Sequence, residues 1–506
     1  MFWSYNSLNL PSTRFPLNPE KWPANARKRS HFGQDVLWMD YDGDKGPGRH
    51  LSTDTLEPYR QIGDESFDRI LALYAEENRA LGPGDDLFGR VPADVKSQSE
   101  ADQALQKMIT QISRIPSWVD KEQLQRGQEV FLAYAPAIGL GLYYRSLVPG
   151  FSIPKIAAVL QATAYLAPPS SKTAVHQRLM DTGAFVGACL QSKDVAAILP
   201  GGDGWKAALR VRLLHAKVRR QLLLRKGGRQ WDTKNLGIPI NQEDMAATLL
   251  AFSTNALLGA EMLLGRPLPL SERLDYLALW RYLGWLLGVD VNDDIDDDDA
   301  SAAPKRRALD PCGPGWLIAS PDPMAHSYAV FQSIIMHALH PDSSSVQIAH
   351  HLLRQGRRRD GDSNNHDASK DEASLARQDT NWFYFRSIQC RRFVGDRLAD
   401  ALELPLRPTW WGRFFQWIFS TIHLTVFCLY TIAGLPISPL RGRLVRFHRN
   451  NLERFMEFWA EEHPRRMQEK LIMSTGTERK EKAPVCPFAM VLPADLGRDE
   501  VVGSPH

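Results

Sequence analysis

The stretch Trp205–Lys226, WKAALRVRLLHAKVRRQLLLRK, carries a histidine at a position where a helix normally buries an aliphatic side chain. Residues spaced three and four apart predict one apolar helix face with a single polar member, the histidine: Ala208, Val211, His215, Val218 and Leu222. Two interpretations fit such a histidine. It is either a core residue satisfied by a backbone carbonyl, or an iron ligand, because an imidazole in an apolar wall is a common way to hold haem.

Composition narrows the class of protein. The chain has 506 residues, of which 43% are hydrophobic and 24% charged, and its net charge is only +3. It can therefore bury a large core, and nothing favours nucleic acid as a partner. Its five cysteines form no Cys-x-x-Cys pair, which excludes a zinc spacing and a dense disulfide framework. A reducing compartment is expected, and the N-terminus lacks the pattern of a secretory signal.

Local patterns predict the domain organisation. Residues 1–60 are rich in Pro, Gly, Asp and Trp without a period, which indicates an irregular arm over the domain surface. Residues 61–473 show helical periodicity, so we expect one large all-α domain. Asp120 and Asn241 are expected to cap helices at their N-termini. A polar insertion at about 355–380 and a tail at 474–506 are expected to be disordered.

Three further residues are candidates for a pocket beside His215. Arg178 and Thr182 are four residues apart and share a helix face, where the guanidinium could hold a carboxylate such as a haem propionate. An ordinary exposed or salt-bridged arginine is the alternative. Thr248 is aligned with Met245 and Phe252 on a predicted core face, where a hydroxyl commonly bonds back to its own helix.

The acidic loop DVNDDIDDDDA, residues 290–300, has three interpretations. As an EF-hand it fails, because Ile295 stands at the position of the sharp-turn glycine and the closing glutamate is absent. Asp293, Asp294 and Asp297 match a DDxxD motif, the pattern with which helical isoprenoid synthases hold magnesium and a diphosphate. The second metal motif of those enzymes is missing. A solvated run of charge is the third interpretation.

Residues 414–435, FFQWIFSTIHLTVFCLYTIAGL, contain no formal charge and are long enough to cross a membrane. Arginines follow at Arg441, Arg443 and Arg446, which suits membrane insertion or attachment at an interface. A core helix of a large all-α protein has the same composition. We expect an intracellular protein, cytoplasmic unless this segment attaches it to a membrane such as the endoplasmic reticulum.

Five stretches together resemble the rubber oxygenase (latex-clearing protein) and MpaB-type oxygenase family: HQRLMDTGAFV, VRLLHAKVRRQL, GIPINQEDMAATLLAFS, LALWRYLGWLLGV and RRFVGDRLADALELP. The resemblance runs from roughly Leu105 to Pro408. Its most specific element is His-Ala-x-Val-Arg at His215–Arg219, preceded by the Arg-x-x-x-Thr pair. The resemblance implies an all-α fold with a globin-like core around haem b. It also implies an enzyme that uses O₂ to cleave carbon–carbon double bonds of isoprenoid chains into carbonyl fragments.

The resemblance implies roles for individual residues. His215 would be the proximal iron ligand, while Arg178, Thr182 and Thr248 would line the haem pocket. Rubber-cleaving members have a lysine immediately before the pocket threonine, where this chain has Asp181, and a glutamate base upstream, where Pro154–Gln177 contains no acid. A smaller hydrophobic lipid or prenylated metabolite is therefore the expected substrate, and Asp181 is a candidate substitute base.

Two other functions remain open from the residues alone. One is a magnesium-dependent isoprenoid synthase that uses Asp293, Asp294 and Asp297. The other is a helical protein that binds haem or lipid without turnover.

Overall fold

The computed structural model describes residues 26–39, 50–81, 99–163, 172–190, 195–225, 230–289, 323–354 and 368–471. The elements are β1 (Ala26–His31), β2 (Gln34–Met39), α1 (Thr53–Leu56), the 3₁₀-helix η3 (Glu57–Gln61), α2 (Glu65–Glu76), α3 (Glu100–Ile112), α4 (Lys121–Leu140), the π-helix η5 (Gly141–Leu147), α5 (Val148–Gly150), α6 (Pro154–Ala162), α7 (Lys172–Leu190), the 3₁₀-helix η6 (Val195–Ile198), α8 (Asp203–Leu223), α9 (Thr233–Leu236), α10 (Gln242–Leu250), the π-helix η7 (Ala251–Asn255), α11 (Ala256–Leu264), α12 (Leu270–Leu286), α15 (Pro323–Ala338), α16 (Ser343–Leu353), α17 (Ala368–Val394), α18 (Asp396–Ala401), α19 (Trp410–Ala433) and α20 (Arg441–Leu471).

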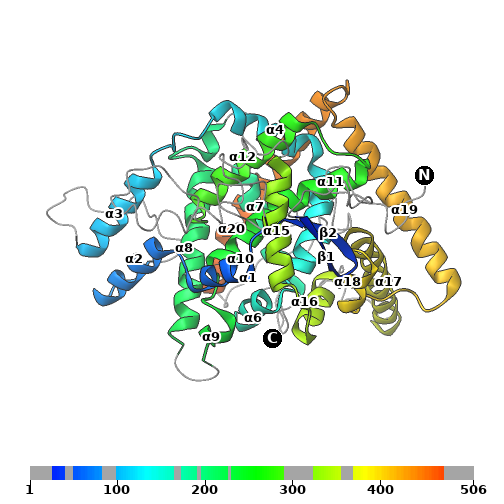
Figure 1. The fold of residues 1–506 in the computed structure, drawn as a ribbon, viewed down its shortest axis with the longest axis horizontal. Coiled ribbons are helices and arrows are strands. Elements are labelled where there is room, and N and C mark those ends of the chain that lie inside the picture. Colours follow the sequence, from blue (N-terminus) through cyan, green and yellow to red (C-terminus); the bar gives the residue numbers. More distant parts are fainter. Residues whose placement is uncertain are drawn as a thin grey trace.

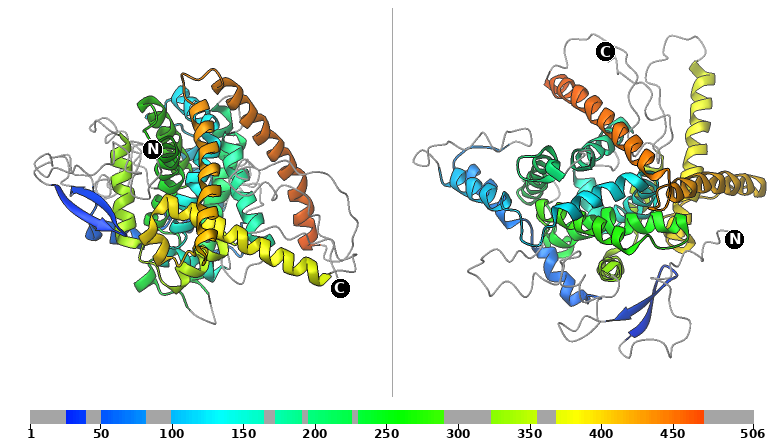
Figure 2. Two further views of the ribbon diagram at one scale, coloured as in Figure 1. Left: turned by 90° about the vertical axis from the view of Figure 1, so that its right-hand side faces the viewer. Right: turned by 90° about the horizontal axis from the view of Figure 1, so that it is seen from above.

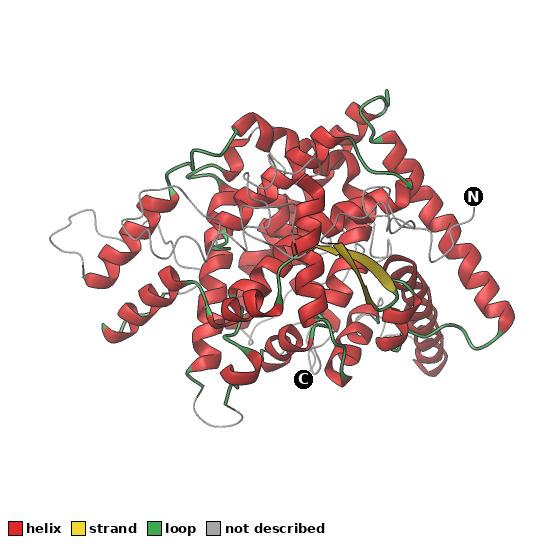
Figure 3. Cartoon of the chain, in the orientation of Figure 1, coloured by secondary structure: helices red, strands yellow, loops and turns green. Residues whose placement is uncertain are grey.

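The fold is all-α, as the sequence predicts (Figures 1 and 3). Within the described residues, the only sheet is the antiparallel hairpin of β1 and β2. One core cluster joins buried side chains from Leu51 to Phe455, so widely separated parts of the chain share a single interior. Helix α4 lies at its centre and packs against α11, α12, α19 and α20. Asp120 caps α4 by accepting a hydrogen bond from the backbone N–H of Gln123 at 3.1 Å, which confirms this predicted cap.

Two π-helices pack against each other inside this core. η5 continues α4, and η7 connects α10 to α11. A Cβ atom on Gly141 would lie 2.5 Å from the backbone oxygen of Ala256, and one on Gly259 would lie 2.2 Å from the Cα of Gly141. The two backbones therefore touch at a point where only glycine fits.

The structure differs from the predicted organisation at two places. The hairpin of β1 and β2 lies within the arm expected to be irregular, and the register from Ala26↔Met39 to His31↔Gln34 is carried by mostly polar residues. Helix α17 begins at Ala368, inside the insertion expected at about 355–380. Its first turns include Ala, Glu, Lys and Arg, residues with high helix propensity. The rest of that insertion, the acidic loop and the tail lie outside the described residues.

Within the described residues, two helical segments are long and apolar enough to cross a membrane, and they differ in burial. In the apolar 18-residue window of Gln242–Leu264, which comprises α10, η7 and α11, 83% of the residues are buried, as expected of a core helix. In the corresponding window of Trp410–Ala433, which is α19, only 28% are buried. α19 packs against α4, α11 and α17 along one side and lies at the edge of the molecule (Figure 1).

Candidate functional site

Two ion pairs fix the position of α8, which carries His215. Arg212 donates to Asp64 through Nε at 2.6 Å and Nη2 at 3.0 Å. One turn beyond His215, the buried Arg219 donates to Asp68 at 2.8 Å and also to two backbone carbonyls of the loop before α10. Both aspartates belong to the start of α2, so α8 is held to α2 on either side of His215.

The imidazole of His215 is half-buried, and its Nδ1 is fully enclosed without a hydrogen-bond partner. The fully buried line on α8 runs through Leu209, Leu213 and Ala216. The ends of the predicted stripe, Ala208 and Leu222, are buried as expected, but its middle, with Val211, His215 and Val218, is rotated to the margin of the packed core. Burial and the neighbouring Arg219 lower the pKa of His215 to about 4. The ring is therefore neutral at pH 7, which is the form that binds a metal.

Helix α7 packs on α8 and carries the other three predicted residues of this region. The Thr182 hydroxyl donates to the backbone oxygen of Arg178 at 2.9 Å. The Oδ1 of Asp181 accepts a hydrogen bond from the indole N–H of Trp459 in α20 at 3.2 Å. Arg178, Asp181 and Thr182 are all half-buried. The Asp181 carboxylate is therefore already engaged with α20, and a role as a base would have to be compatible with this hydrogen bond.

Thr248 is the one exposed residue of α10, whose other members are all buried. Asn241 caps this helix, as predicted, by accepting from the N–H of Asp244 at 2.9 Å. The Thr248 hydroxyl donates to the backbone oxygen of Asp244 at 2.8 Å, as expected of a threonine that bonds back to its own helix. The expectation that Thr248 packs into the core is wrong, however, because its side chain lines a cavity.

This cavity lies between α10, α15 and the segments before and after α5, and most of its wall is apolar. Large apolar side chains on this wall include Phe151, Ile153, Ile156, Phe331, Ile335 and Phe393. Besides Gln34 and Thr248, the polar part of the wall comes from the two π-helices, where Nε of Arg145 donates to Asn255 at 2.7 Å and Asn255 donates back to the oxygen of Arg145 at 3.1 Å. Sequence reasoning missed Arg145, because a π-helix is not recognisable from a 3.6-residue period.

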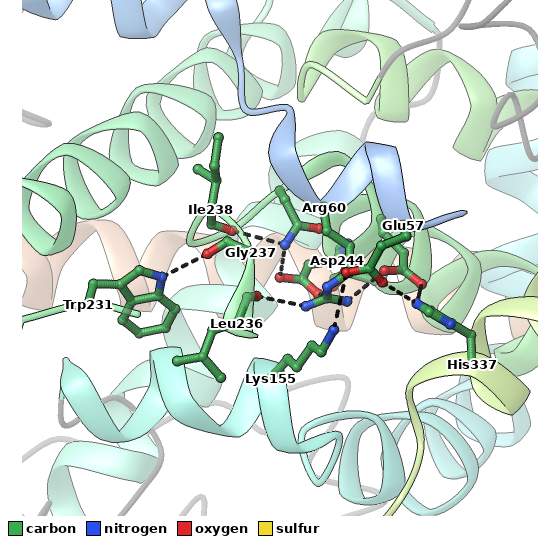
Figure 4. Close-up of polar contacts among 12 residues, drawn as sticks. Glu57, Arg60, Lys155, Trp231, Leu236, Gly237, Ile238, Asp244 and His337 are labelled. Atoms are coloured by element: carbon green, nitrogen blue, oxygen red, sulfur yellow. Dashed lines mark hydrogen bonds and ion pairs between the residues drawn. The ribbon is translucent and has the colours of Figure 1, made fainter. Parts of the chain in front are cut away.

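A buried cluster of charge holds the N-terminus of α10 (Figure 4). Arg60 in η3 contacts Glu243 through Nη1 and Oε2 at 2.6 Å, and both side chains are at most 1% exposed. His337 in α15 lies 3.1 Å from Glu57 and 3.6 Å from Glu243. Burial raises the pKa of Glu243 to about 7, against the effect of Arg60. Sequence reasoning missed this cluster, since its members are far apart in the chain.

The structure thus places the predicted residues in two groups. Arg178, Asp181, Thr182 and His215 lie on the adjacent helices α7 and α8. Thr248 lies on α10, which packs against α12 as α8 does, and within the described part of the chain the cavity beside Thr248 is lined by none of those four residues.

Comparison with known proteins decides the family. Residues 150–424, more than half of the chain, match the model of the family described as "ER-bound oxygenase mpaB/B'/Rubber oxygenase, catalytic domain". The chain belongs to this family. As a member of the mpaB/rubber oxygenase family it is an enzyme, an oxidoreductase of the oxygenase type. The match contains all five predicted site residues, and it starts later and ends later than the stretch from Leu105 to Pro408 in which the resemblance was recognised.

The solved structure titled "Structure of Latex Clearing Protein LCP in the closed state" is similar to this mpaB/rubber oxygenase family member. The two are 17% identical, the similarity covers 78% of this chain and 90% of that one, and the TM-score is 0.47. At these values the likeness supports no conclusion about the site. No curated protein matches the chain.

Proposed function

We propose that this protein is a haem b-dependent oxygenase that uses O₂ to cleave a carbon–carbon double bond of an isoprenoid or lipid-like substrate. The observation that carries the proposal is His215: a neutral imidazole at the margin of an apolar core, with an enclosed Nδ1 that no group among the described residues satisfies. Within the described residues, no three His, Cys, Asp or Glu side chains are grouped so as to hold a metal ion. A single histidine suits a metal that a porphyrin supplies.

The residues around His215 fit a flat prosthetic group. On α7, Thr182 and Phe185 are partly exposed, and so are Val211 and Val218 on either side of His215 on α8. Partly exposed side chains on two adjacent helices are expected where the helices border a space that side chains do not fill. His215 would hold the iron, Arg178 would pair with a propionate, and the Thr182 and Thr248 hydroxyls would line the pocket. When bound, haem would supply the activation of O₂.

The chain's own residues would choose and orient the substrate. The apolar cavity beside Thr248 suits a hydrocarbon segment, because its large side chains offer no hydrogen bonds along most of the wall. Orientation and exclusion of water are the protein's contributions in such a site. Asp181 stands where rubber-cleaving members have a lysine, which supports a smaller lipid or prenylated metabolite rather than rubber.

Absorption spectra of the purified protein, oxidised and reduced, test the proposal. We expect a Soret band that shifts on reduction, and O₂ uptake with a polyprenyl lipid but not with its saturated analogue, with carbonyl products by mass spectrometry. A red protein without O₂ uptake on any alkene would indicate a haem-binding or lipid-binding protein without turnover. A colourless protein that releases diphosphate with Mg²⁺ would instead support the isoprenoid synthase, whose Asp293, Asp294 and Asp297 lie outside the described residues.

A further inference from the structure

Helix α19 turns its apolar face outward and a largely polar line inward, the reverse of a helix on the surface of a water-soluble protein. Its buried line is Gln416, Ser420, Leu424, Phe427 and Thr431, of which three are polar. Its outer line, at the same spacing, is apolar and between 44% and 62% exposed: Trp411, Phe415, Phe419, Ile422, Val426 and Leu429. Figure 2 (left) shows α19 crossing the face of the molecule that is turned to the viewer.

Two polar side chains of α19, Gln416 and His423, bond to α17 on its inner side. Nε2 of Gln416 donates to the backbone oxygen of Tyr384, and the His423 ring bonds to Gln389 at 3.0 Å, both partners lying in α17. The hydroxyl of Thr425, an exposed polar residue on the outer side, donates to the backbone oxygen of Thr421 at 2.8 Å. The Thr425 hydroxyl therefore keeps a hydrogen-bond partner within its own helix, which lowers the cost of placing it in hydrocarbon.

The sequence that contains and flanks α19 carries charge of one sign. Between Glu403 and Glu453 the sequence contains six arginines and no carboxylate side chain, whereas the whole chain is nearly neutral. Arg413 lies at the first turn of α19, and Arg443 and Arg446 are exposed in the first turns of α20. Trp410 and Trp411, at 65% and 62% exposure, stand at the N-terminal end of the apolar face. Basic and indole side chains that border an apolar face suit the headgroup region of a phospholipid bilayer.

We propose that α19 docks this protein on an anionic phospholipid surface, lying in the plane of the membrane with its outer face among the acyl chains. The contacts on the inner side of α19 favour a position in the plane of the membrane over one that spans it. Between Gln416 and His423, α19 is hydrogen-bonded to α17, which carries Arg391 and Arg392, and Arg392 donates to Thr421 at 2.7 Å. A spanning α19 would draw these charged side chains into the hydrocarbon, which is strongly unfavourable.

Vesicle flotation with the full chain tests the docking. We expect binding to phosphatidylcholine vesicles that contain phosphatidylserine, weaker binding to phosphatidylcholine alone, and a loss of at least about tenfold on Phe419→Glu with Ile422→Glu. The matched control is Leu224→Glu with Leu270→Glu, which places the same charge at leucines that are 57% and 49% exposed outside α19, and it should bind as the wild type does. Arg443→Glu with Arg446→Glu should weaken binding to the anionic vesicles by about tenfold or more at low salt, and to neutral vesicles much less.

Depth and assembly measurements exclude the other arrangements. Nitroxide labels on Phe415→Cys and Leu429→Cys should report equal depth in the bilayer, whereas a gradient between them would show that α19 spans it. Wild-type protein that floats with neither kind of vesicle overturns the proposal. If the wild type is then a dimer that Phe419→Glu with Ile422→Glu dissociates, the outer face of α19 binds a second copy of the chain. If the same double variant instead melts at a much lower temperature than the wild type, another segment of this chain covers the face. None of these outcomes depends on haem.

Discussion

At the scale of single residues, His215 is the side chain on which the proposed cofactor depends. Its imidazole is neutral, and its neighbours Val211 and Val218 offer no other metal ligand. We expect His215→Ala to abolish haem binding, because the iron loses its only protein ligand on that side. The measurement is the Soret absorbance after reconstitution, with far-ultraviolet circular dichroism as the test of folding. The exposed neighbour variant Leu214→Ala serves as control, and a Soret band in His215→Ala equal to that of the wild type would contradict the assignment.

Arg178 is predicted to hold a propionate, so its removal should weaken haem retention more than the fold. We expect Arg178→Ala to lose haem during dialysis at least about tenfold faster than the wild type, as the loss of a charge-assisted hydrogen bond of about 1.5–3 kcal/mol implies. Arg178→Lys should recover part of the retention, because it restores the charge but not the bidentate geometry. Equal haem occupancy of all three proteins after dialysis would count against the propionate role.

At the scale of elements, the contact between Gly141 and Gly259 fixes how η5 and α11 approach. Gly141→Ala would bring a methyl group to 2.5 Å from the backbone oxygen of Ala256, which cannot move without shifting α11. We expect a loss of about 2–3 kcal/mol in the free energy of unfolding in urea. Gly150→Ala is the matched control, because its added methyl meets nothing within 4 Å. Equal midpoints for the two variants would refute the close-contact argument.

Element by element, local signals were predictable and tertiary ones were not. Asp120 and Asn241 were recognisable as caps because a cap depends on the next three residues. The rotation of the His215 stripe was not, since it depends on Arg212 and Arg219 pairing with α2. In the same way, the apolar run 414–435 could not show which face of α19 packs on the protein, because this depends on α4, α11 and α17.

Of the predicted site residues, Thr182 and Thr248 illustrate the same limit. Both hydroxyls bond back one turn along their own helices, as short-range chemistry predicts. That Thr248 also lines a cavity depends on α15 and α6, which are distant in sequence. Arg145, on the same wall, had no local signal at all.

At the scale of the whole molecule, Glu243 couples folding to pH through a cluster drawn from three segments of the chain, η3, α10 and α15. Its pKa of about 7 lies above the ordinary value of 4.5, because burial outweighs Arg60. Between these pH values the unfolded chain has lost the proton while the folded chain keeps it. Folded stability should therefore fall as pH rises from 4.5 to 7 through this group, by on the order of 1–3 kcal/mol.

Glu243→Gln tests this coupling. The glutamine cannot ionise, so the fall in stability between pH 4.5 and 7 should be smaller than in the wild type, although the variant is less stable overall because Arg60 loses its closest carboxylate. Urea unfolding across this pH range provides the comparison. Parallel profiles for the two proteins would show that Glu243 ionises normally in the folded state.

The paired π-helices have a consequence for how this protein tolerates insertions and deletions. A π-turn carries one residue more than an α-turn, so η7 shifts the phase of α11 relative to α10. Losing a single residue from Ala251–Asn255 would turn everything after it by about 100°. Gly259 would then face away from Gly141, and Asn255 away from Arg145. The length of this short segment is thus as strongly constrained as its composition.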